Sequence, residues 1–448
     1  MRIVQAVSWY FPESSGGTEV YVAGLSRRLT KWGNDVWIVA PDAGAADERR
    51  YEHEGLPVVR YPIPKAPTRA EAQERAPVRG AARFGRILEE LKPDVVHFHT
   101  FVTGLGLFEV SAAKKTGARV VVTTHSSSLG YLCQRGTLMR WGEVPCDGIC
   151  RPVKCAACVL QKRGLSKPVA WAVAALPPAL GSVAARVPGK IGTGLGMSHL
   201  ITFNQSKQRA LLHTADGFVV LTAGARDMVA ANGARRDKLV LNRLGFSQAL
   251  ARKPGPDVRP TGRPVRIGYL GRFDEVKGVR DLARAVTLVP SELPLVAELR
   301  GPVLTPSEAA IESDVRRLVA GDPRVAFAPP VPPSEVGAVL AGYDVLCCPS
   351  VCAEGGPTVA IEAHAVGTPV VGSRIGGLSE LVTDGVNGRL VPPGDFRELA
   401  RVLEHVARDP GGTVDLWRRA LPEARTMDDV AREYVALYEN AARSSTAP

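Results

Sequence analysis

The sequence lacks the features that mark several large classes of protein. Its 448 residues contain no block of five or more lysines and arginines, and 56 basic against 45 acidic residues give a formal charge of only +11. We therefore expect no nucleic-acid partner; the charge suits a small anionic ligand or an anionic membrane surface. No Gly-x-x-x-x-Gly-Lys-Ser/Thr sequence occurs, and no Gly-x-Gly-x-x-Gly follows the first predicted strand. The common ATP-binding loop is thus excluded, and a nicotinamide cofactor is disfavoured.

Targeting segments and long apolar runs are also missing. The beginning of the sequence lacks the apolar core and the small-residue cleavage site of a secretory signal. The longest uncharged stretch, residues 168–185, carries Pro177-Pro178 at its centre, which would break a membrane-spanning helix. Without a signal, the eight cysteines are not expected to form a secreted disulfide framework. We therefore expect a cytoplasmic protein.

The sequence does contain a repeated alternation of apolar strands and amphipathic helices. In the first half, the predicted strands are residues 3–7, 36–40, 95–99, 119–124, 217–221 and 239–241. In the second half, they are residues 265–270, 295–297, 325–327, 345–347 and 370–371. This alternation predicts an α/β protein with two doubly wound, Rossmann-like parallel sheets, whose strands end at a shared cleft.

Changes in composition predict the domain boundaries. Residues 253–262 are rich in proline and glycine and are typical of a linker. We predict a first domain at residues 1–252, a second at 253–427, and a last helix at 428–448 that crosses back to the first domain. The alternation stops at about 126–214, and this segment, cysteine-rich over 133–158, is predicted to be an insertion in the first domain.

Two motifs of the second half place charged residues after predicted strands. Arg272 and Lys277 lie five positions apart on a strand-to-helix turn, where two cations can clamp a diphosphate. Glu354 and Glu362 lie eight positions apart, separated by the turn Gly355-Gly356-Pro357. Loop amides and a helix N-terminus favour an anion there, and Glu362 can accept hydrogen bonds from vicinal sugar hydroxyls. Taken alone, each motif is also consistent with a solvated surface loop.

Together, these motifs resemble those of a known enzyme family. With the loop Gly16-Gly17-Thr18-Glu19 and the segments 367–371, 376–380 and 387–391, they resemble the retaining nucleotide-sugar glycosyltransferases of family 4, which have the GT-B fold. The resemblance covers most of the chain apart from about 126–214. It implies a nucleoside diphosphate sugar donor, a carbohydrate or lipid-linked acceptor, and a role in cell-surface polysaccharide or glycolipid biosynthesis. It also implies that the chemistry needs no cofactor.

The resemblance assigns roles to residues of the second half. Arg272 and Lys277 match the residues that hold the donor diphosphate. Glu354 matches a residue at the donor sugar and is a catalytic candidate, whereas Glu362 matches the residue at the ribose. Gly355 and Gly356 are counted with the donor-binding residues. No residue is assigned as a nucleophile.

In the first half, the resemblance concerns a glycine loop and one histidine. Gly16 and Gly17 match the loop that approaches the phosphates and the acceptor, and are counted with the donor-binding residues. His97, His99 and His125 follow separate predicted strands without a carboxylate spacing that suits a metal, and a histidine at a strand end is usually structural. Only His125 matches a family histidine, which lies at the donor sugar, so it is the second catalytic candidate.

Five cysteines are concentrated in the predicted insertion: Cys133, Cys146, Cys150, Cys155 and Cys158. Cys155 and Cys158 have the spacing of a zinc knuckle, and upstream cysteines could complete a tetrahedral thiolate site. A structural zinc that staples the insertion is one hypothesis. An iron–sulfur cluster, and cysteines that are free or disulfide-bonded, are the alternatives.

Other interpretations remain at this stage. The stretch 168–185, flanked by basic residues, suits either a packed helix or contact with the inner face of an anionic membrane. A nucleotide-sugar epimerase of the same fold is a second enzyme hypothesis, against which the Gly16-Gly17 loop and the insertion argue. A non-catalytic, metal-stapled interaction subunit is a third, against which the intact donor-site residues argue.

Overall fold

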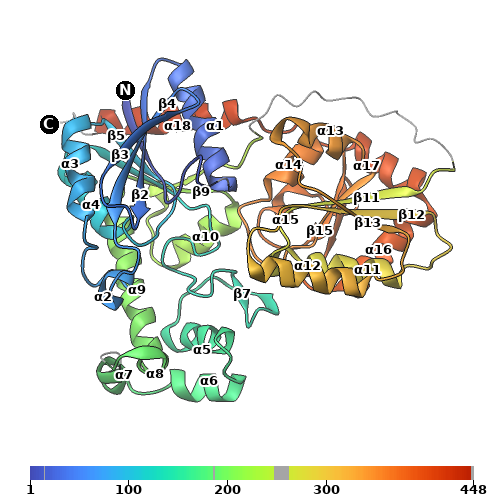
Figure 1. Ribbon diagram of the computed structural model, residues 1–448, viewed down its shortest axis with the longest axis horizontal. Helices are drawn as coiled ribbons and strands as arrows, with labels where there is room; N and C mark the ends of the chain where they lie inside the picture. The colour runs from blue at the N-terminus through green and yellow to red at the C-terminus, as the bar shows by residue number, and fades with distance from the viewer. Residues whose placement is uncertain (15, 185–186, 247–261, 445–448) are drawn as a thin grey trace. The chain divides into compact units, whose positions relative to one another are not determined.

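The computed structural model describes residues 1–448 except 15, 185–186, 247–261 and 445–448 (Figure 1). The chain divides into two compact units. The first consists of Met1–Gly136, Asp147–Arg243 and Thr426–Pro448, and the second of Thr137–Cys146 and Leu244–Arg425. The predicted boundary at residue 253 and most of the predicted linker lie outside the described residues.

The first unit is built on an eight-stranded sheet in the order β10-β9-β6-β5-β1-β2-β4-β3. Its strands are β1 (Arg2–Ala6), β2 (Asp35–Ala43), β3 (Arg49–His53), β4 (Leu56–Ile63), β5 (Val95–Phe98), β6 (Arg119–Thr123), β9 (Gly217–Val220) and β10 (Leu239–Leu241). All neighbours pair in parallel except β3 and β4. The inner strands are apolar because helices cover them on both faces.

The helices of the first unit are α1 (Gly17–Lys31), α2 (Arg69–Ala72), α3 (Ala81–Leu91), α4 (Leu107–Lys115), α5 (Pro152–Lys162), α6 (Lys167–Ala174), α7 (Pro178–Ala184), α8 (Gly189–Leu195), α9 (Met197–Thr214), α10 (Ala223–Ala231) and α18 (Met427–Ser444), with a 3₁₀ turn η1 (Arg236–Lys238). Helix α18 packs against α1 and β6. It belongs to the first unit although it follows the second in the sequence.

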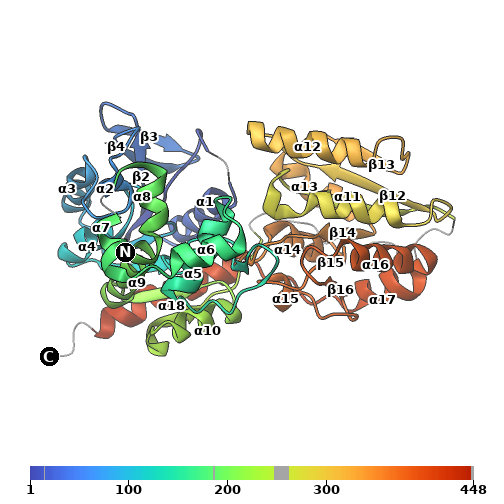
Figure 2. The same cartoon turned by 90° about the horizontal axis from the view of Figure 1, so that it is seen from below.

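Helices α5 to α9 make up most of the predicted insertion, and α5 to α8 lie together (Figures 1 and 2). The uncharged stretch is divided between α6 and α7, which are separated at Pro177 because proline cannot continue a helix. Within the described residues, no helix is long and apolar enough to cross a membrane.

One part of the predicted insertion departs from the expected domain. The segment Thr137–Cys146 forms a small antiparallel hairpin, β7 (Met139–Arg140) with β8 (Val144–Pro145), and groups with the second unit. The amide of Ala353 donates a hydrogen bond to the carbonyl of Thr137 at 2.9 Å. The insertion is therefore not wholly part of the first unit, because main-chain hydrogen bonding attaches this hairpin to the second.

The second unit has a six-stranded, wholly parallel sheet in the order β13-β12-β11-β14-β15-β16. Its strands are β11 (Val265–Leu270), β12 (Leu295–Arg300), β13 (Val325–Ala328), β14 (Val345–Cys348), β15 (Val370–Ser373) and β16 (Gly388–Val391). Its helices are α11 (Val279–Leu288), α12 (Pro306–Leu318), α13 (Val336–Ala341), α14 (Thr358–Ala365), α15 (Leu378–Leu381), α16 (Phe396–Arg408) and α17 (Leu416–Arg419), with short turns η2 (Glu275–Lys277), η3 (Pro333–Glu335) and η4 (Gly411–Asp415). The predicted α/β class with two parallel sheets is confirmed.

Candidate functional site

The two charged motifs of the second unit lie side by side because β11 and β14 are neighbours in the sheet. The turn after β11 carries Arg272 and Lys277, and the loop after β14 carries Glu354. The amide of Val351 donates to the carbonyl of Val276 at 2.8 Å, which joins the two loops. Gly278 has φ +70° and approaches the backbone so closely that a Cβ would stand 1.9 Å from the carbonyl oxygen of Pro349. A side chain there would separate the loops.

Lys277 and Glu354 form an ion pair at the junction of these loops. The Lys277 ammonium donates to both carboxylate oxygens of Glu354 at 2.8 Å. Burial lowers the pKa of Lys277, but the charge and hydrogen bonds of Glu354 outweigh this, so the pKa lies above its ordinary value. This ion pair adds a side-chain contact to the main-chain hydrogen bond that joins the two loops.

Arg272 is held by Glu308, a residue that lies outside both charged motifs. Its Nε donates to Glu308 Oε1 at 2.7 Å, and its side chain remains half exposed. Glu308 is buried at the start of α12, where its Oε2 also accepts from the amide of Thr305 at 3.1 Å. The Thr305-x-x-Glu308 spacing predicts a capping box, but the contact with Arg272 depends on the pairing of β11 with β12.

The loop that carries Glu354 is supported by a Gly-Gly turn. The amide of Gly377 donates to the carbonyl of Glu354 at 2.9 Å. A Cβ on Gly376, whose φ is +55°, would stand 2.4 Å from that same carbonyl oxygen, and a Cβ on Gly377 would stand 2.5 Å from that of Gly355. The Gly355-Gly356 turn therefore lies directly against backbone, which only glycines at 376 and 377 permit.

Glu362 lies on α14 and differs from the other carboxylates. It has no ion pair and no side-chain hydrogen bond among the residues that the structure describes. Burial raises the pKa of Glu362 to about 7. An unpartnered carboxylate of this kind is suited to accept hydrogen bonds from ligand hydroxyls.

In the first unit, Gly16 caps α1 and Gly17 is its first residue. Both glycines are exposed, and the carboxylate of Glu19 lies beside Gly16, where an added Cβ would stand 2.8 Å from its Oε2. A helix N-terminus favours a negative charge, which Glu19 already supplies here.

The three histidines form a buried cluster with α18. The Tyr438 hydroxyl lies 2.7 Å from His97 Nδ1, and His97 Nε2 lies 2.7 Å from Thr123 Oγ1. His99 Nδ1 lies 3.0 Å from Nε2 of His125, which is the one partly exposed histidine of the three. Burial lowers the pKa of all three imidazoles, that of His125 to about 3, so they are neutral at neutral pH.

The cysteines are only partly brought together. The thiols of Cys150 and Cys155 are hydrogen-bonded to each other; this contact lowers the pKa of Cys155 to about 7 and raises that of Cys150. The amide of Arg151 also donates to Cys155 Sγ at 3.4 Å. Among the described residues, no group of three or more His, Cys, Asp or Glu side chains is arranged to hold a metal ion. The structure thus shows a thiol pair rather than a formed four-ligand site.

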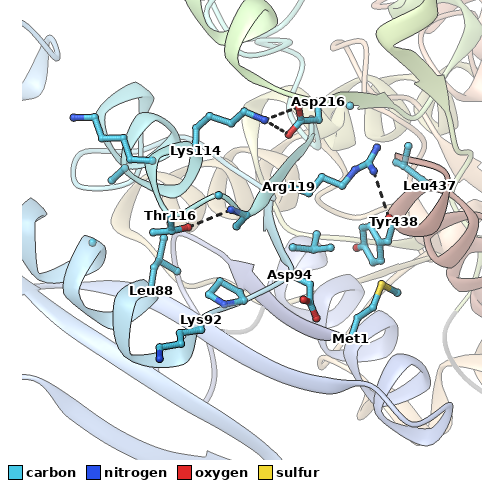
Figure 3. Close-up of a pocket in the computed structure, with 18 of the residues that line it drawn as sticks. Met1, Leu88, Lys92, Asp94, Lys114, Thr116, Arg119, Asp216, Leu437 and Tyr438 are labelled. Atoms are coloured by element: carbon cyan, nitrogen blue, oxygen red, sulfur yellow. Dashed lines mark hydrogen bonds and ion pairs between the residues drawn. The ribbon is translucent and has the colours of Figure 1, made fainter. Parts of the chain in front are cut away.

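The first unit contains a cavity of about 1500 Å³ that none of the predicted site residues lines (Figure 3). Its lining includes Met1, Asp94, Arg119 and Asp216, which precede or begin strands, whereas the predicted site residues follow strands. Lys114 binds both oxygens of Asp216 at 2.7 Å, and Arg119 donates to the carbonyl of Tyr438 at 3.4 Å. The cavity is at the wrong end of a parallel sheet for the predicted chemistry.

Comparison with known proteins gives matches over both units. The profile described as "Glycosyl transferase 4-like domain" matches residues 16–245, and that described as "Glycosyl transferases group 1" matches residues 264–409. The D-inositol 3-phosphate glycosyltransferase of Pseudarthrobacter chlorophenolicus is 26% identical over 425 residues, which cover 92% of this chain and 86% of that protein. The MMP alpha-(1->4)-mannosyltransferase of Mycolicibacterium hassiacum is 42% identical over 111 residues, covering 24% of this chain and 27% of that protein.

Solved structures show the same fold. Sucrose-phosphate synthase from Thermosynechococcus elongatus superimposes with a TM-score of 0.67 and 19% identity, covering 99% of this chain and 100% of that one. Anabaena HepE, solved in complex with UDP, gives a TM-score of 0.65 with 15% identity, covering 98% and 100%. These similarities support the GT-B fold. Since the first profile alone spans more than half of the 448 residues, the chain belongs to the group 1, family 4-like glycosyltransferases.

Proposed function

We propose that this glycosyltransferase moves a sugar from a nucleoside diphosphate sugar to an acceptor hydroxyl, with retention of the anomeric configuration. The observation that carries the proposal is the pair of cations, Arg272 and Lys277, on one turn beside the Glu354 loop. Anabaena HepE, which shares the fold, has been solved in complex with UDP-glucose, which supports this class of donor.

In this proposal, the protein acts by positioning and by electrostatic stabilisation. Arg272 offers a planar fork of donors to one phosphate and Lys277 offers a point charge to the other. Both charges stabilise the diphosphate as it leaves. Glu308 and Glu354 hold the two cations on the turn before the donor binds, so binding requires an exchange of the Lys277 partner from Glu354 to a phosphate. Glu354, released from Lys277 by the incoming phosphates, is then free to bind the sugar hydroxyls.

The proposed donor site is tested by nucleotide titration. Arg272→Ala and Lys277→Ala should each weaken binding of uridine or guanosine diphosphate by about ten- to a hundredfold, because each loses a charge-assisted hydrogen bond. Arg280→Ala is the matched control: Arg280 is a nearby cation that pairs with Glu275 and Asp314 on the surface of the same unit. Calorimetric affinities that are unchanged in the first two variants, or lowered equally in all three, would contradict the assignment.

The acceptor is proposed to be a carbohydrate or lipid-linked hydroxyl, as in cell-surface polysaccharide or glycolipid biosynthesis. Relatives named for D-inositol 3-phosphate make a phosphorylated polyol the second candidate. A mass-spectrometric screen that offers each nucleotide sugar with both acceptor classes identifies the product. The anomeric configuration of that product, read by NMR, tests retention.

We further propose that the protein is cytoplasmic and that α6 to α8 contact the inner face of an anionic membrane. Between Asp147 and Asp216 the sequence contains no acidic residue, but nine lysines and arginines. Three apolar side chains in this segment are more than 45% exposed: Val183 in α7, Val187 between α7 and α8, and Ile191 in α8. Apolar side chains among cations are suited to a surface with anionic headgroups above acyl chains.

We also propose a structural zinc held by Cys133, Cys146, Cys150, Cys155 and Cys158, or by four of them. The support is the sequence spacing and the contact between Cys150 and Cys155. The described arrangement does not by itself form a four-thiolate site, so no catalytic step depends on a metal.

A further inference from the structure

Three side chains of the first unit form a continuous hydrogen-bonded row: Gln5, His99 and His125. Gln5 lies on β1, His99 directly follows β5, and His125 follows β6 by two positions. Gln5 Oε1 lies 2.6 Å from His99 Nε2, and His99 Nδ1 lies 3.0 Å from His125 Nε2. Gln5 and His99 are fully buried. Water therefore does not compete for these contacts.

The row has a definite direction of hydrogen donation. A carbonyl oxygen only accepts, so Gln5 Oε1 requires the hydrogen of His99 on Nε2. Burial, with a smaller contribution from the neighbouring histidines, holds the pKa of His99 well below its ordinary value. The ring is thus neutral, and its Nδ1 accepts. His125 must then donate from Nε2, and as a neutral ring it keeps a lone pair on Nδ1.

The orientation of the Gln5 amide determines this direction. In the structure, the carbonyl oxygen of Gln5 is the atom 2.6 Å from His99 Nε2, and the Gln5 nitrogen has no hydrogen-bond partner among the described residues. If the amide were reversed, its N–H would donate to His99 and the direction of the whole row would be inverted.

We propose that Gln5 and His99 are positioning residues that hold His125 as its Nε2–H tautomer and so reserve Nδ1 as a hydrogen-bond acceptor. Nδ1 of His125 has no hydrogen-bond partner among the described residues. An imidazole lone pair accepts a hydrogen from an O–H or N–H donor, and the donor that we assign to Nδ1 is a hydroxyl. That the hydroxyl belongs to the transferred sugar rests on the proposed function.

The first test observes the tautomer in the full chain without substrate. Protein labelled with ¹⁵N only in its eight histidines is studied by long-range ¹H–¹⁵N correlation at pH 7, and a His125→Gln variant assigns the His125 signals. We expect a protonated Nε2 and a bare Nδ1 at His125. A protonated Nδ1 in the unaltered protein overturns the proposal, because the Gln5 amide would then have the opposite orientation.

Two variants test whether Gln5 sets this tautomer. Gln5→Met removes the acceptor at nearly constant volume and should leave His125 as a mixture of tautomers. Tyr61→Phe is the matched control, because it removes a buried side-chain hydrogen bond of the first unit, to the carbonyl of Gly104, that no member of the row shares. A His125 spectrum that is unchanged in Gln5→Met, or changed equally in both variants, shows a merely structural cluster and overturns the proposal.

Transfer assays connect the row to the sugar. Gln5→Met should lower kcat about tenfold, the worth of one hydrogen bond, and leave the affinity for the bare nucleoside diphosphate unchanged. A tautomer lost without a change in kcat overturns the role of Nδ1 at the sugar. If the protein shows the expected His125 tautomer but transfers no sugar, the hydrogen-bonded row is supported and the proposed function is contradicted. Failure of the row can therefore be distinguished from failure of the proposed function.

Discussion

At the scale of single residues, the carboxylates near the proposed donor site differ in their partners. Glu308 and Glu354 each bind a cation, whereas Glu362 has no such partner among the described residues. Burial therefore raises the pKa of Glu362 to about 7. A pair of ribose hydroxyls that donate to this carboxylate would favour its ionised form, so its charge at neutral pH depends on the ligand.

We predict that the affinity for uridine diphosphate rises as the pH passes upward through about 7. Below the pKa of Glu362 a proton must leave before the hydroxyls can donate, which costs up to about tenfold in affinity per pH unit. The nucleotide phosphate titrates in the same range, so Glu362→Gln is the control that keeps only the phosphate effect. The affinity for uridine diphosphate is measured by calorimetry at several pH values for the unaltered protein and for Glu362→Gln. Identical pH dependences of the two affinities would contradict the assignment of Glu362 to the ribose.

A different outcome is expected for Glu354, because it competes with the phosphates for Lys277. Glu354→Gln should bind nucleoside diphosphate at least as tightly as the unaltered protein, since it removes the competing charge. Its turnover should fall by about a hundredfold or more, because the variant impairs the residue that we propose to bind the sugar. Turnover and calorimetric affinity are measured on the same preparation. A variant that loses affinity and keeps turnover would reverse the roles assigned to Glu354 and Glu362.

At the scale of elements, the inner strands were predictable because a parallel strand covered on both faces is an apolar run, as in β6. The β3–β4 hairpin was missed because β3 consists of polar, largely exposed residues at the sheet edge. Helix α16 was also missed, although Asp395 caps it and Leu399, Leu403 and Val406 recur at helical spacing. In that case the signal was present in the sequence.

The proposed site was predictable only where a motif is local. The turn with Lys277 and the loop with Glu354 each stand out by spacing, but their contact depends on the adjacency of β11 and β14. Glu308 appears in the sequence only as a capping residue, since its contact with Arg272 joins residues of different strand–helix units. Long-range pairing of this kind is set by sheet order, which a single sequence does not show.

The cysteine-rich segment gives a prediction at this scale. Protein prepared under reducing conditions should carry about one zinc per chain, because four thiolates saturate one tetrahedral ion. Chelation should expose α5 and its neighbouring turns to proteolysis first, while nucleotide binding survives, since the six-stranded sheet has its own core. The test is elemental analysis of the zinc content of the unaltered protein and of Cys158→Ser. Cys347→Ser serves as the control, because Cys347 is a buried cysteine outside the segment. Metal-free protein would leave the Cys150–Cys155 contact as a thiol pair.

At the scale of the whole molecule, the distribution of charge is uneven. The chain carries +11 in total, and the segment from residue 148 to 215 contributes nine cations and no carboxylate. Within this segment, Arg151 and Lys154 pair with Asp147, and Lys207 pairs with Glu74. The proposed membrane surface therefore rests on the exposed apolar side chains of α7 and α8 together with Lys167 of α6 and Lys190 of α8. If the acceptor is lipid-linked, this surface would hold the enzyme where its acceptor resides.

We predict that the protein binds vesicles containing phosphatidylglycerol and not vesicles of phosphatidylcholine alone, and that added salt weakens the binding. Ile191→Asp, which places a charge at a side chain that is 74% exposed, should lower binding by more than about tenfold, and Lys190→Glu by a smaller factor. Leu416→Asp is the matched control, because Leu416 is 55% exposed on the second unit. Co-sedimentation and light scattering are measured on each variant. Equal vesicle binding by all of the variants would show that this face does not contact a membrane. A dimer that forms without lipid and is dissociated by Ile191→Asp would show instead that a second copy of the chain covers this face.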